Sequence, residues 1–209
     1  MLTREKGSKA VTSTSLKLFR ELERIGRIRL SPSFFLRDFL HSEIAQSHGM
    51  INKPDDLNLA VENGTRLCVE ILEPLQKHFG TIRVRSGYRS AELNAFGHAH
   101  GLKCASNSRN YAAHIWDHLD AHGNRGASAC VVLPALMSRA GDRDDAGVVV
   151  AGWASEHLPF DRIMFFRQCA TFNIGWRDSP RRIIIGLRKK VSARDCTGGI
   201  SSIATTLCC

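Results

Sequence analysis

The chain has 209 residues, of which 43% are hydrophobic and 23% are charged. This balance is that of a globular protein and excludes a disordered or fibrous chain, and a chain of this length can bury a core without disulfides or a structural metal. The net charge of +9 favours anionic partners, among them nucleic acid, anionic lipid headgroups and bacterial cell-wall polymers.

Several classes of protein are disfavoured by the sequence pattern. No apolar run reaches the roughly 20 residues of a membrane-spanning helix, and no Walker loop, zinc finger or other nucleic-acid module accompanies the basic charge. Residues 1–14 contain no apolar signal-peptide core, so we expect a chain that is cytoplasmic as synthesised, with release to the cell wall by a non-classical route left open. The seven cysteines show no paired CxxC spacing, and their odd number indicates mostly reduced thiols.

The first half of the chain is predicted to be largely helical. Residues 1–30 are basic and polar with a short helical pattern, and we interpret them as a loosely attached, partly disordered extension. The folded domain is expected over residues 31–187 and begins with a short helix within 34–40. The clearest helix follows the N-capping pair Asp55-Asp56 and ends at Gly80, with interruptions predicted at Gly64 and Pro74.

Short strands dominate the prediction for the second half. One further helix is expected around residues 149–157, a charged surface loop at 139–147, and a disordered basic and Ser/Thr-rich tail at 188–209. The fold class is therefore α+β, a small, mainly antiparallel sheet with helices packed on one side. The strands are expected at residues 81–86, 129–133, 162–166, 172–176 and 182–187.

The sharpest motif is SGYRS at residues 86–90, which follows a predicted strand and is followed four residues later by Asn94. With the helical sequence LEPLQKHFG before it, this pattern resembles the zinc D-alanyl-D-alanine carboxypeptidases of the hedgehog/DD-peptidase type. The upstream sequences FLHSE at 39–43 and NKP at 52–54 are similar to further elements of that family. The resemblance covers roughly residues 32–187.

The resemblance implies a substrate site in the SGYRS loop. Arg89 would bind substrate and stabilise a developing oxyanion, because a fixed guanidinium offers two donors to a carboxylate or oxyanion. Ser86 and Tyr88, in the same loop, would contribute substrate contacts. The alternative is that Arg89 only holds its own loop in place through local hydrogen bonds.

The first two zinc ligands of the family come from an H-x-x-G-x-A-x-D motif, from which this sequence departs. If residues 126–131 replace the end of that motif, Cys130 stands at the position of the aspartate ligand, and the histidine position falls on Gly123, beside His122. Alternatively, His114 is the family histidine, and the hairpin that follows it has lengthened.

The segment around His114 is dense in possible metal ligands. Residues 114–122 hold three histidines and two aspartates, and imidazole and carboxylate are the usual ligands of open catalytic zinc sites. The candidate zinc ligands are His114, Asp117, Asp120 and His122. Their spacing matches no standard signature, and a solvated polar hairpin tip explains most of the segment equally well.

The third zinc ligand and the general base of the family are also replaced. The family has a histidine in a late strand, and the matching stretch at 171–176 places Asn173 there. No carboxylate lies between Arg162 and Phe172 to activate a zinc-bound water, and Asn is a poor zinc ligand. We therefore expect a peptidase-like domain for peptidoglycan stem peptides with a degenerate metal site, or a non-catalytic cell-wall-binding or structural module on the same scaffold.

Overall fold

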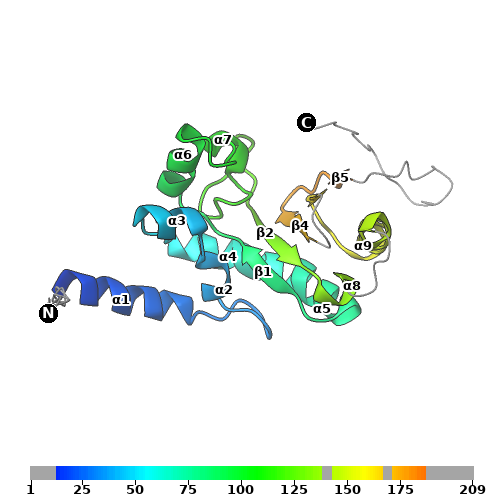
Figure 1. The fold of residues 1–209 in the computed structure, drawn as a ribbon, viewed down its shortest axis with the longest axis horizontal. Coiled ribbons are helices and arrows are strands. Elements are labelled where there is room, and N and C mark those ends of the chain that lie inside the picture. The colour runs from blue at the N-terminus through cyan, green and yellow to red at the C-terminus, as the bar shows by residue number, and fades with distance from the viewer. Residues whose placement is uncertain (1–12, 138–142, 167–170, 187–209) are drawn as a thin grey trace, which may run out of the picture.

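The computed structural model describes residues 13–137, 143–166 and 171–186. Its architecture is α+β, a five-stranded mixed sheet with helices (Figure 1). The expected 188–209 tail and the first 12 residues of the expected extension lie outside the described residues. None of the described helices combines the length and the apolar character that crossing a membrane requires.

The sheet has the strand order β1-β2-β4-β3-β5, in which all neighbours are antiparallel except β3 and β5. The prediction of a mainly antiparallel sheet is thus confirmed, and every predicted strand is present with shifted ends. The largest shift is in β2, which begins three residues earlier than expected. The strands are β1 (Arg83–Ser86), β2 (Gly126–Val132), β3 (Arg162–Phe165), β4 (Thr171–Arg177) and β5 (Ile183–Ile185).

The expected long helix forms, and the interruption occurs at its centre. Helix α4 (Leu57–Leu67) passes into a π-helical turn, η1 (Cys68–Leu72), and then into α5 (Glu73–Phe79). The side chain of Asp56 caps the start by accepting a hydrogen bond from the Leu59 amide at 3.0 Å, and Gly80 ends it with a φ of +89°.

The other helices agree only partly with the prediction. The predicted charged loop at 139–147 is wrong for residues 143–147, which form the first turns of the last helix, while 138–142 lie outside the described residues. The short helix expected within 34–40 is present. These helices are α1 (Ser13–Gly26), α2 (Arg37–Leu40), α3 (Glu43–His48), α6 (Ala91–Ala99), α7 (Asn107–Asn110), α8 (Pro134–Met137) and α9 (Arg143–His157).

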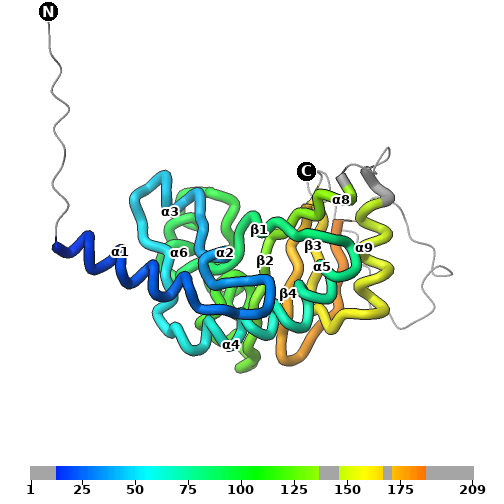
Figure 2. The backbone as a smooth tube through the Cα atoms, turned by 90° about the horizontal axis from the view of Figure 1, so that it is seen from below, coloured from blue at the N-terminus to red at the C-terminus, as the bar shows by residue number. Residues whose placement is uncertain are grey.

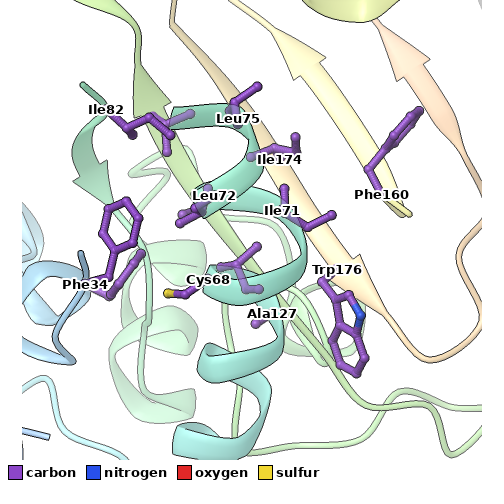
Figure 3. Packing of buried hydrophobic residues seen from close by; sticks show 14 of the residues in the cluster. Phe34, Cys68, Ile71, Leu72, Leu75, Ile82, Ala127, Phe160, Ile174 and Trp176 are labelled. Atoms are coloured by element: carbon purple, nitrogen blue, oxygen red, sulfur yellow. The ribbon is translucent and has the colours of Figure 1, made fainter. Parts of the chain in front are cut away.

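Alternation along the central strands gives the sheet two different faces. Odd-numbered residues of β2 and even-numbered residues of β4 belong to the hydrophobic core, where they meet α4, η1 and α5 (Figure 3). Buried residues of α9 join the same core. The other face of β2 and β4, which we call the second face, carries Ser128, Cys130, Asn173, Gly175 and Arg177.

The N-terminal extension is shorter than expected. Much of α1 projects from the body of the protein, as Figure 2 shows. However, Ile25 and Leu30 are each only 3% exposed and belong to the core cluster. The domain therefore includes residues that the sequence analysis assigned to the extension.

Candidate functional site

The SGYRS loop connects β1 to α6 and is held by the side chain of Asn52. The Asn52 amide nitrogen donates to the Tyr88 carbonyl at 2.9 Å, and its oxygen accepts from the Ser90 amide at 2.9 Å. Ser90 in turn caps α6 by accepting from the Leu93 amide at 3.2 Å. A Cβ at Gly87 would lie 2.6 Å from the Phe39 ring, so the backbone passes too close for any other residue.

Arg89 is fixed at one end of its guanidinium and unpaired at the other. One terminal nitrogen donates to Asn94 Oδ1 at 3.1 Å and lies 3.2 Å from Cys104 Sγ. Within the described residues, its Nε and its second terminal nitrogen make no hydrogen bond, and the side chain is half-buried. Local anchoring and ligand contact are therefore compatible, because two donors remain available.

Asn94 is the centre of a buried amide network beneath Arg89. Its nitrogen donates to Asn107 Oδ1 at 2.7 Å, and its oxygen also accepts from Asn110 Nδ2 at 2.8 Å. Both Asn94 and Asn110 also donate to the Ala105 carbonyl, at 3.0 and 3.3 Å. Asn94 belongs to the predicted motif, but its partners were not predicted, and their only signal in the sequence is the clustering of asparagines at 107 and 110.

His114 lies between this loop and the sheet. Its Nδ1 is 2.9 Å from the Gly87 carbonyl, its own carbonyl accepts from the Arg89 amide at 2.8 Å, and the preceding carbonyl, that of Ala113, accepts from the Ser128 amide of β2 at 2.8 Å. A carbonyl can only accept, so Nδ1 carries the proton and Nε2 keeps its lone pair. Burial and the nearby Arg89 charge lower the pKa of His114 to about 4, which leaves it neutral at pH 7.

Tyr88 and Asp117 do not face a ligand, contrary to expectation. Tyr88 is 1% exposed, and its hydroxyl donates to Asp117 Oδ2 at 3.0 Å. The same carboxylate oxygen accepts from the Asp55 amide at 2.8 Å. Burial, with the charge of Asp117, raises the pKa of Tyr88. The pair joins the SGYRS loop to the start of α4 and supports the site from inside.

Asp120 and His122 lie together in one turn, where Asp120 is engaged by other partners. Asp120 forms an ion pair with Arg177 and accepts hydrogen bonds from Asn124 and from the His122 amide. Burial would raise the pKa of Asp120, but these hydrogen bonds and the Arg177 charge lower it to about 2. His122 is exposed in the same turn.

The four candidate zinc ligands are thus not brought to one point. Within residues 13–137, 143–166 and 171–186, no group of three or more His, Cys, Asp and Glu side chains is arranged to hold a metal ion. A zinc site with three protein ligands does not fit this donor set. The lengthened hairpin of the second alternative is also not present, because residues 111–125 form turns with a single isolated bridge, Tyr111 to Ile115.

Cys130 and Asn173, which the motif resemblance places at the positions of two zinc ligands, are directly paired across β2 and β4. Paired residues of antiparallel strands project on the same side, so both lie on the second face. Cys130 is 5% exposed, and burial raises the pKa of its thiol despite the opposing charge of Arg85. The thiol is therefore protonated at neutral pH.

No protein-family model, curated protein or solved structure matches this chain.

Proposed function

We propose that this chain is a divergent peptidase-like domain of the hedgehog/DD-peptidase type that recognises peptidoglycan stem peptides. The observation that carries the proposal is the state of Arg89, whose guanidinium is anchored by Asn94 at one nitrogen and has two unpaired donors beside neutral His114. A guanidinium held in this way suits the terminal carboxylate of a peptide. The net charge of +9 also favours an anionic wall polymer.

Recognition is favoured over hydrolysis by the donor set on the second face. A catalytic zinc needs three protein ligands, and the paired positions hold a protonated, buried thiol and an amide. Of the four candidate zinc ligands, His114 has the arrangement of a metal-binding histidine, with Nδ1 bonded to a carbonyl and Nε2 left with its lone pair. We therefore assign Arg89 and His114 to ligand binding.

Replacement of Arg89 by lysine tests the carboxylate contact. Lysine keeps the charge but loses the planar pair of donors, so we expect Arg89→Lys to bind the pentapeptide L-Ala-γ-D-Glu-L-Lys-D-Ala-D-Ala about tenfold more weakly. Isothermal titration calorimetry measures this affinity for wild type and variant.

The same peptide with a C-terminal carboxamide is the matched control. It should bind wild type about tenfold more weakly and should show little further loss with Arg89→Lys, because the contact is already absent. Equal affinity of wild type for the acid and the amide would show that Arg89 does not bind this carboxylate. Absence of any pentapeptide binding would overturn the proposed function itself.

Zinc content provides a separate test of the degenerate site. Because the described donors do not converge, we expect protein purified from zinc-supplemented medium to contain far less than one zinc per chain, with no change in His114→Ala. Elemental analysis of both proteins measures this. About one zinc per wild-type chain, lost in His114→Ala, would instead support a zinc peptidase that uses His114.

A further inference from the structure

A corner of the second face contains a buried ion network that neutralises both of its aspartates. Asp161 is 5% exposed, and its two oxygens accept from Arg181 Nε at 2.8 Å and from a terminal Arg181 nitrogen at 2.6 Å. Arg177 is 6% exposed and pairs with Asp120, while its Nε lies 3.4 Å from Asp161. Each aspartate is thus compensated by an arginine.

Two further arginines at this corner have no such partner. Within the residues that the structure describes, neither Arg162 nor Arg109 forms an ion pair with a carboxylate. Partial burial and the charges of Arg181, Arg177 and Arg109 lower the pKa of Arg162, with only Asp161 opposing them. Four arginines and two aspartates therefore leave a net charge of about +2 at one place.

The backbone independently places these arginines together. Arg162 is paired with Gly175, which is two residues before Arg177 on β4. The next residue, Ile163, belongs to the core, so Arg162 projects from the second face. The segment that carries Arg109 crosses the same corner, since the Ala112 carbonyl accepts from Arg177 at 3.2 Å.

This corner is close to the candidate site. Gly175 is two residues along β4 from Asn173, a separation of about 7 Å along the strand. Asn173 is paired with Cys130, and Cys130 with Ser86 at the start of the SGYRS loop. A peptide extending from Arg89 to Arg162 would therefore run across β1, β2, β4 and β3, over the half-buried Ser86 and Asn173 and past the buried Cys130.

We propose that Arg162 and Arg109 bind a second carboxylate of the peptide ligand, so that the site selects stem peptides with a free acidic group upstream of the terminal carboxylate. This inference rests on the proposed function and names the chemistry of its ligand. Arg162 and Arg109 supply the contacts, and the Arg177–Asp161–Arg181 network holds the corner in place.

Amidation of one carboxylate tests this second contact. The probe is again L-Ala-γ-D-Glu-L-Lys-D-Ala-D-Ala, compared with the peptide in which the free α-carboxylate of D-Glu is a carboxamide. We expect amidation to weaken binding to wild type about tenfold, and to have little effect on Arg162→Gln, which already lacks the contact. Arg109→Gln should reduce the effect of amidation in the same direction.

Arg24→Gln is the matched control, because Arg24 is an exposed arginine of α1 and its loss changes the net charge equally. This variant should respond to amidation as wild type does. If amidation weakens Arg162→Gln as much as wild type, the second contact is wrong while the proposed function stands. If wild type binds neither peptide, both proposals are overturned.

Discussion

His114 and the preceding residue Ala113 together connect the SGYRS loop to β2. Its imidazole contacts the Gly87 carbonyl of the loop, and the neighbouring Ala113 carbonyl binds β2 through the Ser128 amide. Beyond the Ser86–Cys130 pair, β1 no longer pairs with β2, and residues 113–116 contact β2 there instead. The Trp116 indole also donates to the Ser128 carbonyl at 3.1 Å. The histidine is thus positioned by backbone on both sides.

The lowered pKa of His114 predicts a stability change between pH 6.5 and 4. Its folded pKa, about 4, lies below the ordinary value of 6.5, so the unfolded state binds the proton more readily. The free energy of unfolding should therefore fall as pH falls through this range, by at most about 1.4 kcal/mol per pH unit from this group. Urea denaturation at pH 7, 6, 5 and 4.5 measures it.

His114→Gln provides the comparison, because glutamine can still donate to the Gly87 carbonyl but does not titrate. The variant should lose the part of the slope that belongs to His114. Hydrogen bonds from Arg181 and Arg125 lower the pKa values of Asp161 and Asp178, but those carboxylates act at lower pH and equally in both proteins. Parallel pH curves for the two proteins would contradict the prediction.

At the scale of elements, the π-helical turn explains how the long helix accommodates Pro74. The proline is the second residue of α5, directly after η1, where the regular i to i−4 hydrogen bonding has already been interrupted. Gly64 does not interrupt the helix, contrary to expectation. It lies inside α4, where the Trp116 ring packs against it, a contact with a residue 52 positions away that local sequence does not reveal.

Alanine at Gly64 should destabilise the protein, although alanine is the better helix former. The new Cβ would lie 2.7 Å from the Trp116 ring and 3.2 Å from Leu30, so we expect a loss of about 1–3 kcal/mol from overpacking. Gly152→Ala is the control, since Gly152 lies within α9 with nothing within 4 Å of a Cβ there, and it should stabilise by up to about 1 kcal/mol. Chemical denaturation measures both. Equal effects of the two substitutions would contradict the packing argument.

Across the whole molecule, structural features that depend on neighbouring residues were predicted better than features that depend on long-range contacts. Alternation located β1, and the capping Asp56 located the longest helix, because both signals depend on neighbouring residues. The strand order and the inclusion of Ile25 in the core depend on distant partners and had no local signal. The Arg89 loop was predicted because its motif is contiguous in the sequence. Its Asn110 support and the Arg162 corner were not predicted, because they depend on residues that are distant in the sequence.

The position of β1 has a consequence for self-association. It is the first strand in the sheet order, so its outer side has no strand partner in the part of the chain that the structure describes. An outer strand can template pairing with another chain, and positive charges on it oppose such pairing by repulsion between identical copies. Arg83 and Arg85 are both exposed on β1. Repulsion between these arginines on identical copies therefore opposes edge-to-edge pairing of the protein at high concentration.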